Sequence, residues 1–134
     1  MATLTRTNFD GALCLRRVLQ VDGAAVTVSG AAFLAGAGRL EELLGIPAAL
    51  QVPLGAALLV WAAVLIYGAT RPVISRRLGW AAVIVNALWV ADSVLLLVAG
   101  WLPLTQAGFW FVAAQALAVA VLAELQYIGL RRMR

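Results

Sequence analysis

Residues 78–99 read LGWAAVIVNALWVADSVLLLVA, and this stretch decides the class of the fold. It holds a single charged side chain, that of Asp92. Because an α-helix rises about 1.5 Å per residue, roughly 20 apolar residues cross a hydrocarbon core of about 30 Å. Inside lipid the backbone has no water to bond with, and a helix satisfies its own polar groups. The stretch therefore predicts a transmembrane helix.

Three other stretches have the same apolar character, namely residues 18–38, 49–69 and 105–129. The links between the stretches are short, and short links make neighbouring helices antiparallel. Segment 39–45 carries leucines at helical spacing, and we expect it to form one or two helical turns at the membrane interface. The sequence therefore predicts an all-α fold, a four-helix transmembrane bundle with antiparallel neighbours. We expect the chain, residues 1–134, to form a single transmembrane domain.

The composition supports a membrane protein and excludes several classes of site. The chain is 64% hydrophobic and 12% charged, with a mean hydropathy of +0.98, far from the values of a soluble domain. It contains one cysteine and no histidine, which excludes an internal disulfide, a paired-cysteine redox centre and histidine-ligated haem. A Ser-His-Asp triad is excluded for the same reason. We therefore predict no catalytic residues, no metal site and no cofactor, and we rank an enzyme last.

The basic residues are all arginine, and they gather at the ends of the apolar stretches. Nine of the ten fall on one predicted side of the membrane, and only Arg39 falls on the other. The nine are Arg6, Arg16, Arg17, Arg71, Arg76, Arg77, Arg131, Arg132 and Arg134. Cytoplasmic loops carry such an excess of positive charge, so we expect both termini in the cytoplasm and the arginines near lipid headgroups. This placement explains the basic isoelectric point without a nucleic-acid partner.

Two acidic residues are predicted close to the cytoplasmic edge of the bundle. Asp22 and Glu124 each lie about four to five residues inside the first and fourth spans, so they meet at one level if these spans touch. Arg16, Arg17 and Arg131 are near enough to reach toward them. One interpretation is a structural ion cluster beneath the headgroups. The alternative is a proton or cation site open to the cytoplasm, because charge inside a membrane is costly and often functional.

A second polar group follows one stripe of the third span. Asn86, Trp89, Asp92 and Ser93 fall within about one third of the helix circumference. Asp92 is predicted in the outer half of the membrane, away from any arginine. Gln115 in the fourth span lies at about the depth of Asn86, and we expect these two amides to bond. The stripe is interpreted either as a functional pocket or pore, or as polar contacts that hold the helices together.

Several segments resemble small four-span bacterial membrane proteins. They are residues 44–47 (LGIP), 86–90 (NALWV), 111–119 (FVAAQALAV), 123–127 (AELQY) and 129–132 (GLRR). The resemblance covers about the whole chain and implies a multi-pass protein of a bacterial inner membrane. It implies no particular activity, and it carries no catalytic or binding residue over to this sequence.

Three functions are compatible with these residues. The first, which the absence of a catalytic constellation favours, is a non-enzymatic accessory or scaffold protein that acts in a homo-oligomer or in a larger membrane complex. The second is an oligomeric transporter or channel protomer for a proton, a cation or a small amphipathic solute, which uses Asp92 and its polar neighbours. The third is a membrane enzyme or a lipid- or pigment-binding protein with a pocket lined by Trp61, Trp89 and Trp110. In each case the predicted surroundings are the lipid bilayer.

Overall fold

The computed structural model describes the backbone of residues 2–133 and the side chains of residues 11–133. This part of the chain is helical and contains no strand. The helices are α1 (Ala2–Ala35), α2 (Ala37–Leu44), α3 (Ala48–Thr70), α4 (Arg76–Ala99) and α5 (Gln106–Arg132). Four segments are long and apolar enough to cross a membrane: Gly11–Ala35 within α1, and helices α3, α4 and α5. The predicted all-α bundle is confirmed. The side chain of Arg6 and the whole of Arg134 lie outside the described residues.

The boundaries of three predicted stretches agree with those of α3, α4 and α5 to within three residues. The boundaries of the first stretch do not agree with those of α1. Helix α1 begins well before Val18 and ends at Ala35, because Gly36 leaves the helical conformation at φ −116° and ψ 21°. The short helix α2 then follows, where leucine spacing predicts helical turns. Asp22 stays near the end of the bundle that holds the termini, level with Leu65 and Ile66, which lie within five residues of the end of α3.

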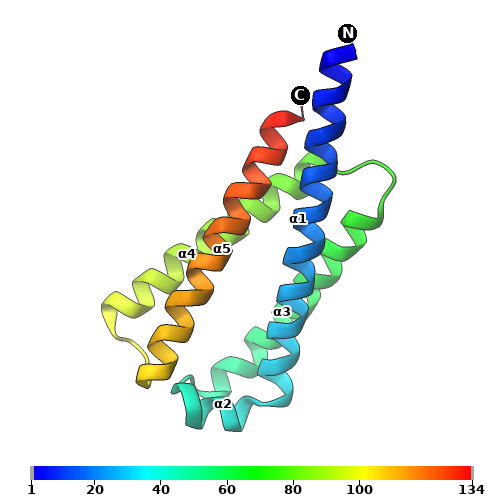
Figure 1. The fold of residues 1–134 in the computed structure, drawn as a ribbon. Helices are drawn as coiled ribbons and strands as arrows, with labels where there is room; N and C mark the ends of the chain where they lie inside the picture. The colour runs from blue at the N-terminus through cyan, green and yellow to red at the C-terminus, as the bar shows by residue number, and fades with distance from the viewer. Residues whose placement is uncertain (1, 134) are drawn as a thin grey trace.

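The four long helices form two antiparallel pairs. Helix α1 packs along α3, and α4 packs along α5, while α1 also contacts α5 and joins the pairs. Helices α3 and α4 barely touch. Figure 1 shows that the pairs lie close together at the end that holds both termini and diverge toward α2. Helix α2 lies across the far end and contacts α3 and α5.

Glycines allow the close approach of α1 and α3. A Cβ atom built on Gly55 would lie 2.9 Å from the carbonyl oxygen of Gly30, and a Cβ on Gly30 would lie 2.9 Å from that of Gly55. No real side chain tolerates such a distance to a backbone atom. Small residues with this role are typical of packed membrane helices.

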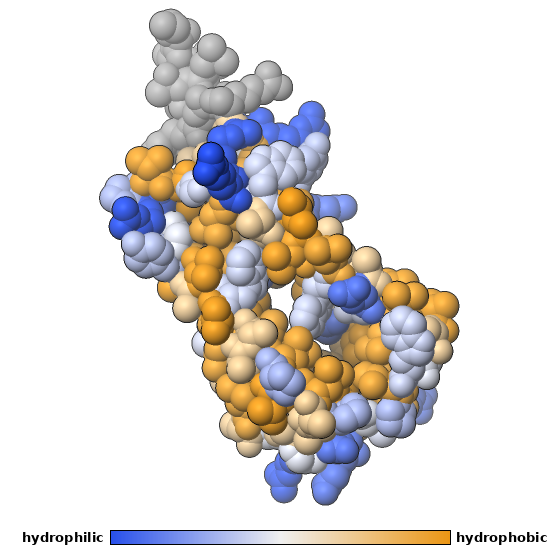
Figure 2. Space-filling view, turned by 180° about the vertical axis from the view of Figure 1, so that it is seen from behind, coloured by the Kyte–Doolittle hydropathy of each residue, from blue (hydrophilic) through white to orange (hydrophobic). Residues whose placement is uncertain are grey.

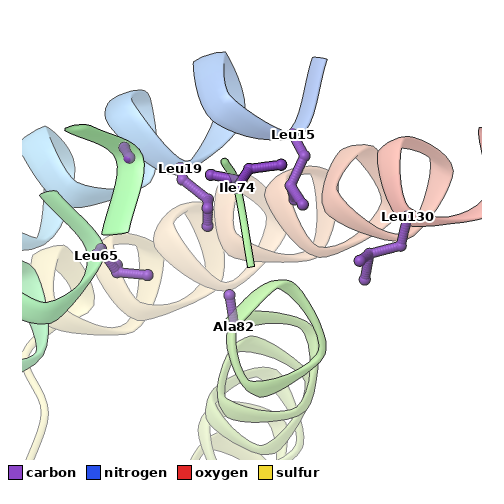
Figure 3. Close-up of a cluster of buried hydrophobic side chains, with 7 residues drawn as sticks. Leu15, Leu19, Leu65, Ile74, Ala82 and Leu130 are labelled. Atoms are coloured by element: carbon purple, nitrogen blue, oxygen red, sulfur yellow. The ribbon is translucent and has the colours of Figure 1, made fainter. Parts of the chain in front are cut away.

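The end that holds the termini is closed by a buried apolar cluster. Its members are Leu15, Leu19, Leu65, Ala69, Ile74, Ala82 and Leu130. Figure 3 shows these side chains converging from α1, α3, α4, α5 and the α3–α4 link. Leu15, Leu19 and Leu65 are completely buried. We call this group the apolar cluster.

Arginines join the helix ends outside the apolar cluster. The Arg16 guanidinium donates to the backbone carbonyl of Ala69, to that of Arg71 at 2.7 Å and to that of Pro72 at 3.2 Å. It therefore satisfies carbonyl groups that the last turn of α3 leaves without helical partners. Arg76 donates to the carbonyl of Leu130 at 3.4 Å and links the start of α4 to the end of α5.

Candidate functional site

Three polar side chains from three helices meet in the interior, one turn away from the apolar cluster. Asp22 of α1, Asn86 of α4 and Gln126 of α5 are 1%, 5% and 0% exposed. Asn86 Nδ2 donates to Asp22 Oδ2 at 2.9 Å and to Gln126 Oε1 at 2.9 Å. Gln126 Nε2 donates to the same Asp22 oxygen at 2.7 Å. We call these residues the polar triad; it ties α1 to both members of the α4–α5 pair.

The triad corrects two sequence-based expectations. The first and fourth spans do touch, but Asp22 contacts Gln126 and Asn86, whereas Glu124 is exposed on another face of α5. The residues at 124 and 126 differ by about 200° around a helix, so only one of them faces α1. An amide–amide bond does link α4 to α5 through Asn86, but its partner is Gln126, and the predicted Gln115 partner was wrong.

A second polar group lies farther along α4 and α5. Trp89 Nε1 donates to Gln115 Oε1 at 2.6 Å, and Gln115 Nε2 donates to Ser93 Oγ at 3.0 Å. Ser93 Oγ in turn donates to the Trp89 carbonyl at 2.8 Å. These bonds fix the indole ring and the amide of Gln115 against each other. The polar stripe predicted on the third span therefore divides between two groups, with Asn86 in one and Trp89 and Ser93 in the other.

Asp92 differs from these residues because it lies on a pocket between the diverging helix pairs. The pocket has a volume of about 340 Å³, within the range that small ligands occupy. Its aromatic walls include Phe33, Trp89, Trp101 and Phe111. Asp92 is exposed, and within the described residues its carboxylate has no hydrogen bond to another side chain. It is the one ionisable side chain that lines this pocket.

The pocket opens where α3 and α4 separate. Figure 2 shows a largely apolar surface with an opening through it, in the half of the molecule away from the uncertain residues drawn in grey. Leu50 and Leu54 of α3 line one side of the pocket, and Leu95 and Leu96 of α4 line the other. A solute can therefore enter from the side of the bundle, between α3 and α4.

The apolar cluster, the polar triad and the pocket follow one another along the bundle. On α1 they correspond to Leu19, Asp22 and Ser29, which lie along one stripe at helical spacing. On α4 the same order is Ala82, Asn86 and Trp89. The triad therefore separates the closed end of the molecule from its open pocket.

Sequence reasoning missed several of the contacts and residues that shape these sites. Gln126 is recognisable as an amide within a span, but its contact with Asp22 depends on how α1 and α5 pack. Phe33 and Trp101 line the pocket although they come from distant segments. Gln51 is fully buried and donates to the carbonyl of Ile46 at 2.7 Å, which fixes the link between α2 and α3. Because Gln51 and Ile46 are close in sequence, this contact was accessible to sequence-based prediction.

The described residues contain no group of three acidic or cysteine side chains able to hold a metal ion. Their long helices expose large apolar side chains such as Val28, Val60 and Leu117, each at least 67% exposed. Such surfaces are stable in contact with lipid, and they define a multi-pass membrane protein. No protein-family model, curated protein or solved structure matches the chain.

Proposed function

We propose that the protein binds a small amphipathic cation in the pocket between its two helix pairs and acts as a transport protomer for it. The observation that carries this proposal is the position of Asp92, an exposed carboxylate on a pocket whose walls are mostly apolar and aromatic, with Ser29, Ser93 and Gln115 as the other polar side chains. A carboxylate in such surroundings attracts positive charge strongly because little water screens it. Aromatic faces add cation–π attraction, and quaternary ammonium groups are the ligands they favour.

The fixed second polar group supports selection of a cation. The indole N–H of Trp89 and the amide of Gln115 are already bonded to each other and to Ser93. These groups therefore offer a ligand few free donors, and an anionic or strongly hydrogen-bonding solute would lose its hydration without compensation. An apolar cation loses little hydration on entering the pocket and gains attraction to the Asp92 carboxylate.

The proposed orientation places the pocket in the outer half of a bacterial inner membrane. Arg16, Arg17, Arg76 and Arg77 lie at the end that holds the termini, whereas Arg39 lies at the other end. The excess of positive charge supports a cytoplasmic location for the first end. A single chain leaves its two pairs apart beside α3 and α4, and we infer that a symmetric homo-oligomer completes the enclosure.

Binding of benzyltrimethylammonium to the purified protein in mild detergent tests the proposal. This cation carries one aromatic ring and a fixed charge, so its state does not change with pH. We expect Asp92→Asn to raise its dissociation constant about tenfold, because the substitution removes the charge and keeps the shape. Glu124→Gln is the matched control, since it removes an exposed intramembrane carboxylate away from the pocket, and we expect a change below about twofold.

Two results would contradict the transport proposal. One is equal affinity of the wild type and Asp92→Asn, and the other is background-level flux of the cation into vesicles that contain the wild-type protein. Either result would favour the accessory or scaffold function, which the polar triad also supports because its bonds hold helices together. A partner that co-purifies from the native membrane would then be the expected finding.

A further inference from the structure

We propose that Asp22 is a proton-binding site, and that its proton is exchanged for the cation that occupies the pocket. This inference rests on the proposed function. The buried carboxylate of Asp22 takes no part in the binding of a cation at Asp92. Asp22 is 1% exposed and lies within the candidate membrane span of α1. An unneutralised charge at this position is costly, so a group that neutralises it has a large effect.

Among the described side chains, the elements packed around Asp22 provide no cation. On α1 the nearest basic residues are Arg16, which is bound to carbonyl groups at the end of α3, and Arg17, which is exposed. At this level α3 presents Leu65 and Ile66, which lie beside Gly23. The neighbours on α4 and α5 are the neutral amides of the triad.

The remaining titratable groups nearby point elsewhere. Glu124 and Tyr127 of α5 and Tyr67 of α3 are exposed, and Tyr127 packs against Trp80 with their ring centroids 5.9 Å apart. Asp92 lies six residues after Asn86 on α4, at the pocket. A proton is therefore the positive charge available to neutralise Asp22 within the closed part of the bundle.

Protonation changes the bonding of the triad. The ionised carboxylate accepts two amide N–H groups at Oδ2. When hydronium donates its proton to the carboxylate, water is released and the new O–H group must itself donate. An amide oxygen of Asn86 or Gln126 then has to turn toward it. These bonds join α1 to the α4–α5 pair, so the proton alters the contact between the two halves of the molecule.

The position of the triad couples proton binding at Asp22 to cation binding in the pocket. Leu19 and Leu130 of the apolar cluster shield Asp22 from the end that holds the termini, so exchange with water is favoured from the pocket side. Asp92 lies about 9 Å farther along α4 than Asn86. A cation there repels a proton on Asp22 across a medium of low dielectric, and each ligand weakens the other by the same factor.

Infrared spectroscopy tests the proton site without any solute. We expect the wild type to show a protonated-carboxyl C=O band that grows as the pH is lowered. The component due to Asp22 should be missing in Asp22→Asn and should persist in Glu124→Gln. Asp22→Glu keeps a carboxyl group in a new position, so the C=O band component of residue 22 should shift in frequency. This shift assigns the component even if Asp22→Asn folds poorly. A spectrum unaltered by either change at position 22 would overturn the proposal.

Binding of benzyltrimethylammonium as a function of pH tests the coupling. On acidification we expect the dissociation constant of the wild type to rise about tenfold more than that of Asp22→Asn. Binding to the wild type should also release protons into a weak buffer, and Asp22→Asn should release fewer. Equal pH dependence in the two proteins would refute the exchange. An Asp22 band in a protein that does not bind the cation would instead refute the proposed function and leave the proton site standing.

Discussion

At the scale of single residues, the intramembrane polar groups differ in whether the protein satisfies them. Asp22, Asn86 and Gln126 satisfy one another in the interior, and Trp89, Ser93 and Gln115 do the same beside the pocket. Asp92 is exposed on the pocket wall. Polar residues that bond across helices stabilise a bundle, whereas a carboxylate without such a partner inside a membrane costs stability.

Replacing Gln126 by leucine tests the structural contribution of the triad. The change removes the donor 2.7 Å from Asp22 and the acceptor used by Asn86, so two buried groups lose a partner. We expect the free energy of unfolding in mild detergent to fall by about 1–3 kcal/mol. Glu124→Leu is the control on the same helix, and it should not destabilise the protein because Glu124 is exposed. Equal effects of the two substitutions would contradict the triad.

At the scale of helices, contact between backbones decides which elements pair. Gly30 and Gly55 bring α1 and α3 close together, and Gly36 and Gly45 bound the short helix α2. Gly45 has a φ of 79°, a conformation that residues with a side chain adopt at a cost. The α1–α3 pair is therefore built on small residues, which membrane helices use because lipid does not drive apolar side chains together.

Alanine at Gly55 should separate α1 from α3. Its Cβ would lie 2.9 Å from the Gly30 carbonyl and 3.0 Å from the Cβ of Phe33, so a helix has to shift. We expect a loss of about 1–3 kcal/mol in the free energy of unfolding, measured by denaturation in detergent micelles. Gly38→Ala is the matched control, because a Cβ at Gly38 meets no atom within 4 Å. Alanine there should be neutral or stabilise α2 by up to about 1 kcal/mol.

At the scale of the whole molecule, the end that holds the termini is closed and charged, and the two helix pairs lie apart in the half toward α2. The apolar cluster and the arginine contacts to Ala69, Arg71 and Leu130 hold all four long helices together near the termini. Toward α2 the two pairs diverge and leave the pocket between them. Beyond the pocket, helix α2 bridges the two pairs through its contacts with α3 and α5.

Thiol labelling in intact cells tests the proposed orientation. Cys14 is first replaced by serine, and single cysteines are introduced as Glu42→Cys in α2 and Val73→Cys in the α3–α4 link. Both positions are exposed, Val73 to 82%. We expect a membrane-impermeant maleimide to label Glu42→Cys in intact cells, and to label Val73→Cys only after the membrane is permeabilised. The reverse pattern would place the pocket on the cytoplasmic side.

The sequence by itself determined the class of the fold and the positions of most helices, because crossing lipid demands long apolar helices whatever their neighbours are. It also located the polar residues inside the spans. Only the tertiary structure decided their partners, since contacts depend on the rotation and axial shift of each helix. The rotation of α5 about its axis brought Gln126, and not Glu124, against Asp22. The pocket at Asp92 likewise exists because α3 and α4 diverge, a separation that no local pattern encodes.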